Sequence, residues 1–173
     1  MLKPLVALAL SSLAVPALAG ECESNFKKSG NPLVMTTYSS AVTVPNLATR
    51  DALAQMRGIL VAEKMDVMAD DPDGGTLLVE QRQDKAARPI PTTVTVSEVA
   101  SGTRIEMAVK MERGVFSKVE QIQPYMCGLF AKVKGGKEGM AAARKGAGAS
   151  NNEANGNQDV YLFSRMIARE ADK

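Results

Sequence analysis

Residues 92–112 read TTVTVSEVASGTRIEMAVKME, and this stretch decides the fold. Apolar and polar residues alternate on both sides of the turn ASGT, which predicts a β-hairpin because successive strand side chains point to opposite faces. The apolar face carries Val94, Val96, Ile105, Met107, Val109 and Met111. The polar face carries Thr93, Thr95, Ser97, Arg104, Glu106 and Lys110. One dry face and one wet face predict an antiparallel sheet that is covered on one side only.

The flanking segments supply the remaining strands and the cover. Residues 33–44, LVMTTYSSAVTV, are typical of a strand, and residues 65–81 predict a second hairpin around the turn DPDGG. Apolar residues at helical spacing predict helices over 47–62 and 117–134. In the first helix Gln55 falls on a polar face, and Ser117 with Glu120 predicts a capping box at the start of the second.

This order of elements predicts an α+β domain over residues 33–135: a two-layer sandwich with a five-stranded antiparallel curved sheet and two helices on one face. It resembles the helix-grip or TBP-like (β-α-β4-α) arrangement of small bacterial envelope domains, such as those of the outer-membrane assembly lipoprotein BamC. In the resemblance, helices 47–62 and 117–134 take corresponding places. A shared fold of this kind carries no function with it.

The N-terminus predicts export. Residues 1–19 contain Lys3, a short apolar run and a small-residue cleavage site ending at Ala19, the three parts of a secretory signal peptide. Glu21 stands between the glycine and the cysteine of LAGEC, so Cys22 lies one residue beyond the position that bacterial lipoproteins lipidate. We therefore expect cleavage after Ala19, an unlipidated periplasmic protein, and an N-terminal lead over residues 20–32.

The chain has two cysteines, Cys22 and Cys127. An even count in an oxidising compartment favours a single disulfide. Two free thiols remain the alternative at this stage. A reactive thiol is less favoured, because the chain has no histidine to activate Cys127 and no C-x-x-C motif.

The C-terminal part changes in composition. Residues 136–158 are rich in Gly, Ala and Asn and predict a flexible linker, and residues 159–173 form an apolar segment that fits a helix or a strand. That segment either folds back or docks on a partner through Val160, Tyr161, Leu162, Phe163, Met166 and Ile167. A basic cluster either contacts anionic lipid or cell-wall polymer, or simply keeps the linker soluble: Lys132, Lys134, Lys137, Arg144 and Lys145.

The residue composition excludes several classes of catalytic and ligand-binding site. The absence of histidine excludes Ser-His-Asp and Cys-His catalysis and most zinc sites. A net charge of +2 is too small to indicate a nucleic-acid-binding surface. No stretch after the signal peptide is long and apolar enough to predict a transmembrane span. Four aspartates crowd the 65–81 hairpin, but their spacing departs from a calcium loop, so we expect a solvated turn: Asp66, Asp70, Asp71 and Asp73. We expect no cofactor and no metal.

Three functions remain, and the oligomeric state stays open. The favoured hypothesis is a non-enzymatic periplasmic binding or accessory protein that acts by protein–protein contact in the bacterial envelope. The first alternative is a carrier of a small apolar ligand or lipid between sheet and helices, with a cavity lined by Met56, Met107, Met111 and Met126. The second is a carboxylate enzyme that uses Glu98 and Glu106 across the wet face of the hairpin.

Overall fold

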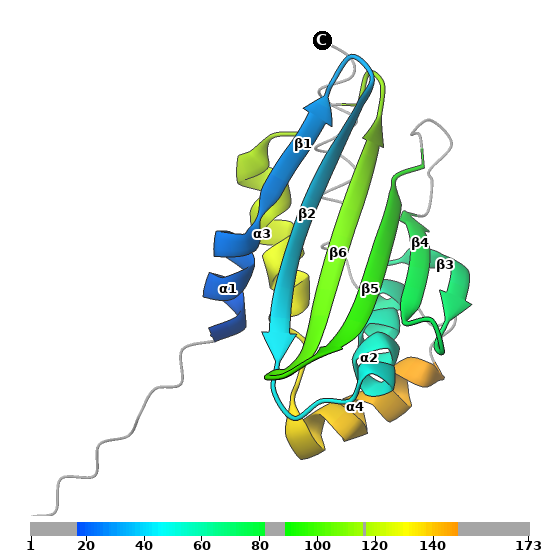
Figure 1. The fold of residues 1–173 in the computed structure, drawn as a ribbon. Coiled ribbons are helices and arrows are strands. Elements are labelled where there is room, and N and C mark those ends of the chain that lie inside the picture. The colour runs from blue at the N-terminus through cyan, green and yellow to red at the C-terminus, as the bar shows by residue number, and fades with distance from the viewer. Residues whose placement is uncertain (1–16, 82–88, 116, 149–173) are drawn as a thin grey trace, which may run out of the picture.

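The structure, a computed structural model, describes residues 17–81, 89–115 and 117–148. It contains a six-stranded antiparallel sheet in the order β1-β2-β6-β5-β4-β3 (Figure 1). The strands are β1 (Lys27–Asn31), β2 (Met35–Val44), β3 (Met65–Asp71), β4 (Thr76–Gln81), β5 (Pro91–Val99) and β6 (Gly102–Glu112). The helices are α1 (Ala17–Asn25), α2 (Thr49–Ala62), α3 (Val119–Phe130) and α4 (Gly136–Ala147). The α+β prediction is confirmed, and the predicted count of five strands is wrong.

The β5–β6 hairpin forms as predicted. Val94 lies opposite Met107 and Val96 lies opposite Ile105 in the antiparallel register. All six residues of the predicted apolar face are buried. Helices α2 and α3 lie behind this face of the sheet in Figure 1, and their apolar stripes join it in one core.

The sixth strand, β1, falls inside the segment predicted to be an irregular lead. All five of its residues are exposed, and its sequence KKSGN has little strand propensity. It is a strand because it pairs with β2 across a tight turn, from Lys27 opposite Ser39 to Asn31 opposite Met35. Leu33 and Val34, predicted as the start of the next strand, belong to that turn.

Helix α3 is shorter than the predicted helix over 117–134, and the predicted capping box does not form. The N-cap is Lys118, without a side-chain cap. The Ser117 hydroxyl is buried without a hydrogen-bond partner, while the Ser117 carbonyl accepts a 2.7 Å hydrogen bond from the Tyr38 hydroxyl. Contact with β2 therefore sets the entry into α3, in place of the local capping pattern.

Residues 136–147, predicted as part of a flexible linker, form helix α4 and pack against α2. Gly146 of α4 and Gly58 of α2 permit the close approach. A Cβ on Gly146 would lie 1.8 Å from the Ala54 carbonyl oxygen, and a Cβ on Gly58 would lie 2.6 Å from the Gly146 Cα. Gly- and Ala-rich composition is thus used here for helix packing, although the same composition is typical of linkers.

Gln55 holds the turn that leads into α4. Its side-chain amide donates to the Lys134 carbonyl and accepts from the Lys134 N–H, both at 2.9 Å. The residue is buried, whereas the helical pattern placed it on a polar face. A buried glutamine is stable here because it satisfies two backbone groups that would otherwise lack partners.

In the part of the chain that the structure describes, no helix is long and apolar enough to cross a membrane.

The glycine contact between α2 and α4 leads to a stability prediction. Gly146→Ala should lower the free energy of unfolding by about 1–3 kcal/mol, because the added methyl collides with backbone that cannot rotate away. Denaturant unfolding measures this. The matched control is Gly128→Ala in α3, where a Cβ meets nothing within 4 Å, and which should gain about 0.5–1 kcal/mol. Equal effects of the two substitutions would contradict close packing of α4.

Candidate functional site

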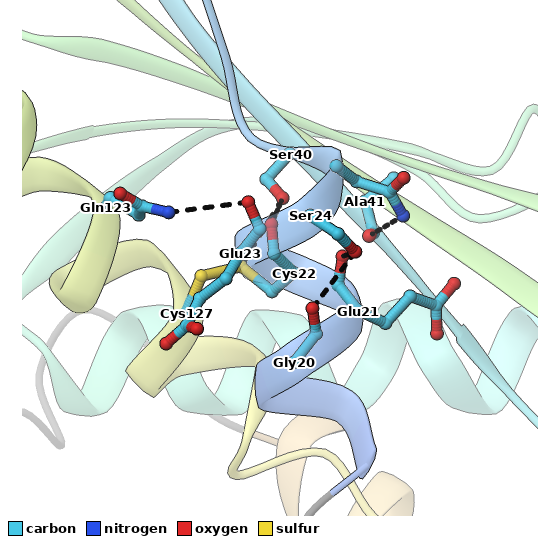
Figure 2. Close-up of a disulfide and its surroundings, with 10 residues drawn as sticks. Gly20, Glu21, Cys22, Glu23, Ser24, Ser40, Ala41, Gln123 and Cys127 are labelled. Carbon is cyan, nitrogen blue, oxygen red and sulfur yellow. Dashed lines mark hydrogen bonds between the residues drawn. A yellow bond between two sulfur atoms is a disulfide. The ribbon is translucent and has the colours of Figure 1, made fainter.

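The predicted pairing of Cys22 with Cys127 is present in the structure (Figure 2). The disulfide joins α1 to α3 across 105 residues of sequence, with a Cα–Cα distance of 5.5 Å. Both cysteines are buried, at 0% and 4% exposure. The bond therefore lies inside the core and ties the N-terminal helix to the layer that covers the sheet.

Helix α1 covers the part of the β2 edge that β1 does not reach. The β1–β2 pairing ends at Lys27 and Ser39, and beyond it no strand of the described residues pairs with this edge of β2. Two α1 side chains take that place. The Asn25 amide donates to the Ala41 carbonyl at 2.9 Å, and the Glu21 carboxylate accepts from the Thr43 N–H at 3.0 Å.

The spacing of these two residues explains the arrangement. Glu21 and Asn25 are four positions apart, so they share one face of α1. Their side chains act as a surrogate strand, because unpaired edge groups are otherwise a template for pairing with other chains. Glu21, the residue that displaces the cysteine from the lipidation position, thus has a structural role in the folded protein.

The backbone of α1 is fastened as well. The Ser40 hydroxyl of β2 donates to the Cys22 carbonyl at 2.6 Å, and the Gln123 amide of α3 donates to the Glu23 carbonyl at 3.4 Å (Figure 2). These contacts involve residues that follow Ala19. The predicted cleavage after Ala19 would shorten α1 without removing any of these donors or acceptors.

The predicted basic cluster is held on folded elements and does not lie in a linker. Lys132 forms an ion pair with the buried carboxylate of Glu63. The other members are exposed, in the turn before α4 and on α4 itself: Lys134, Lys137, Arg144 and Lys145. The predicted docking residues Val160, Tyr161, Leu162, Phe163, Met166 and Ile167 lie outside the described residues.

Two aspartates of the β3–β4 hairpin have partners within the domain. Asp70 pairs with Arg57 of α2, and the Asp71 carboxylate accepts from the Gly74 N–H at 2.9 Å. Within residues 17–81, 89–115 and 117–148, no three His, Cys, Asp or Glu side chains gather as metal ligands would.

The two carboxylates considered for catalysis do not share a face. The register places Glu98 opposite Thr103, which is buried on the helix side, and Glu106 opposite Thr95, which is exposed on the other side. The expectation that Glu98 and Glu106 meet across the wet face is therefore wrong. Their separation follows from the alternation of strand side chains. Glu98 is two residues after the core residue Val96 and so shares its face, whereas Glu106 directly follows the core residue Ile105 and points the other way.

Tyr125 lies near the buried Glu63. Burial raises the pKa of the Tyr125 phenol well above its ordinary value, and the negative charge of Glu63 raises it further. The phenol therefore stays protonated near neutral pH and offers no base for catalysis.

The four methionines considered for a ligand cavity are fully buried in the core: Met56, Met107, Met111 and Met126. A hollow of about 220 Å³ lies elsewhere, on the surface where α2, the β3–β4 turn and the end of α4 meet. It is lined by Arg50, Leu53, Ala54, Arg57, Asp70, Pro72 and Ala147. This hollow is not the space between sheet and helices that the carrier hypothesis requires.

The sequence does not predict one exposed apolar surface, which lies at the turn between β1 and β2. Leu33 and Val34 lie in that turn, and Met35 is the first residue of β2, in agreement with the predicted strand. The available signal was Asn31-Pro32, a pair that favours a turn directly before these residues.

The disulfide leads to a stability prediction. The double variant Cys22→Ser, Cys127→Ser should unfold about 2–5 kcal/mol more easily, since the crosslink closes a long loop in the unfolded chain. Denaturant unfolding with and without a reducing agent measures this. The reductant should destabilise the natural chain and leave the double variant unchanged. An equal response of both proteins would contradict the crosslink.

The sheet-edge contact leads to a second prediction. Glu21→Ala should cost about 1.5–3 kcal/mol, because the Thr43 N–H loses a charged acceptor. Glu21→Gln should cost less, since its amide oxygen can accept the same hydrogen bond. Amide hydrogen exchange at Thr43 provides the readout, with faster exchange in the alanine variant. Unchanged exchange at Thr43 would rule out the contact.

No protein-family model and no curated protein matches the sequence. Among solved structures, the chain is similar to CalU16 from Micromonospora echinospora, with 9% identity, a TM-score of 0.40, and coverage of 76% of this chain and 99% of that chain. It is also similar to the conserved protein of unknown function EF2215 from Enterococcus faecalis, with 4% identity, a TM-score of 0.40, and coverage of 88% and 94%. These likenesses are at the level of the fold, and neither supports the resemblance to the BamC domains.

Proposed function

We propose that this protein is an exported, non-enzymatic binding or accessory protein, which acts in the bacterial envelope by contact with another envelope protein. The observation that carries the proposal is the buried disulfide of Cys22. Cys22 is the third residue after the proposed cleavage site, so the first residues of the processed chain are anchored in the core. Such a bond suits an oxidising compartment, here the periplasm.

Three carboxylates of the described domain support binding over catalysis because they have structural partners. Glu21 accepts from the β2 backbone, Glu63 pairs with Lys132, and Asp70 pairs with Arg57. A catalytic acid or base needs a side chain that can reach a substrate.

The carrier hypothesis is the weaker of the binding readings. Its candidate methionines fill the core, and flexible methionine side chains are well suited to packing a core with few aromatic residues. We also propose, as the finer description of the fold, that α2, α3 and the sheet correspond to a helix-grip arrangement to which β1, α1 and α4 are added.

We assign the partner contact to the apolar segment 159–173, which follows α4 in the sequence. An apolar segment of this length can add to a partner as a strand or as a helix in a groove. The proposal therefore separates two parts of the chain, a stabilised domain and a segment that binds.

The test is crosslinking and pull-down from envelope extract, comparing residues 20–173 with residues 20–148. The shorter chain ends after α4, because removing α4 would expose the face of α2 that carries Gly58. The matched control is the longer chain with Phe163→Ser and Ile167→Ser. Both changes should remove the same partner. Identical partner lists from all three proteins would refute docking by the segment.

A further inference from the structure

The turn between β1 and β2, together with the first residue of β2, exposes three consecutive apolar side chains. Leu33 is 69% exposed, Val34 is 73% exposed and Met35 is 46% exposed. The turn lies at one extreme of the molecule, at the upper end of the β1–β2 hairpin in Figure 1. We call Leu33, Val34 and Met35 the apolar tip. Apolar side chains this exposed, gathered at a projecting point, are typical of a contact surface.

The backbone of the apolar tip is satisfied from within. The Asn31 side chain accepts from the Leu33 N–H and the Asn31 carbonyl accepts from the Val34 N–H, both at 2.9 Å. Pro32, between them, has no N–H to satisfy. The tip can therefore enter an apolar medium without exposing an unpaired donor at these positions, a condition that lipid imposes strictly.

The turn is also fixed in shape. Gly30 has a φ of +89°, and a Cβ at this position would lie 2.2 Å from the Met35 carbonyl oxygen. Only glycine fits there without displacing the start of β2. The apolar tip is therefore presented in one conformation, and little ordering is required when it binds.

The charges around the apolar tip are mainly basic. No Asp or Glu occurs from Ser24 to Arg50, whereas β1 carries Lys27 and Lys28. Lys110 of β6 lies opposite Thr37, near the same end of the sheet. Glu112, opposite Met35, is the acidic neighbour in this region, and Arg113 follows it in the chain.

The distance of the basic residues from the apolar tip suits contact with lipid phosphates. Lys28 is four residues before Pro32, where the turn begins, or about 13 Å at the rise of a strand. Its ammonium lies 5.6 Å from the centre of the Tyr38 ring. Lysine side chains extend along apolar surface and place their charge among headgroups, so Lys28 and Lys110 are positioned for lipid phosphates when the tip is immersed.

From these observations we infer that the apolar tip inserts shallowly into an anionic lipid surface, with Lys27, Lys28 and Lys110 directed to its phosphates. The tip is convex, and its three side chains are aliphatic or thioether. Protein interfaces depend mainly on Trp, Tyr and Arg anchors that fill pockets. This inference adds a membrane contact to the proposed function and does not depend on it.

Helix α4 is the competing lipid-facing surface. Its exposed residues include Met140, Lys137 and Arg144, but its small residues are already packed against α2. Figure 1 shows α4 at the opposite end of the molecule from the apolar tip. One flat membrane therefore cannot contact both surfaces.

The test uses the absence of tryptophan from the chain. Leu33→Trp introduces a single reporter at the tip of the oxidised protein, residues 20–173. Vesicles of phosphatidylcholine with phosphatidylglycerol should shift its emission to shorter wavelength, and brominated acyl chains should quench it. Met140→Trp on α4 and Met68→Trp on β3 are matched controls at exposed methionines and should not respond.

Charge reversal completes the test. Lys28→Glu with Lys110→Glu, added to Leu33→Trp, should weaken vesicle binding by about tenfold or more, because each lysine near the surface contributes about 1 kcal/mol. Circular dichroism confirms that the variant folds. An unresponsive Leu33→Trp would overturn the inference, and so would a response confined to Met140→Trp. An equal response with pure phosphatidylcholine would overturn the anionic assignment.

Discussion

The constraint on which this structure depends is that its sheet has one apolar face. Strict alternation along β5 and β6 leaves residues such as Val94 and Met107 with a single direction in which to be buried. Covering that face requires α2 and α3, and their stripes complete one contiguous core. The cover needs support of its own. α4 packs on α2 through glycine contacts, and Gln55 fixes the turn that positions it.

The second constraint is that the edge strands of the sheet carry unpaired backbone groups, and the two edges are protected in different ways. At the β2 edge, Glu21 and Asn25 of α1 satisfy the backbone groups that β1 does not reach. At the other edge, β3 has an irregular register between Val67 and Ala69, and such bulges discourage pairing with further strands. The disulfide then secures α1, so the edge cover cannot detach independently of the core.

These structural roles account for many of the groups that could have supported chemistry. Glu21, Glu63 and Asp70 are engaged within the domain, and Tyr125 is kept in its neutral form. Two exposed surfaces of the described domain lie apart from these groups, the apolar tip at one end of the molecule and the basic helix α4 at the other.

Patterns local in sequence were sufficient for the central hairpin, the two covering helices and the pair of cysteines, because alternation, helical periodicity and an even cysteine count each reflect a local or compositional cause. They failed for β1, α4, Gln55 and Glu21. KKSGN becomes a strand only through its pairing with β2, and the Gly-rich α4 is stabilised by close approach to α2. Gln55 and Glu21 bind backbone groups 79 and 22 residues away. The energy of each of these features comes from a partner distant in sequence, so the assembled fold alone decides them.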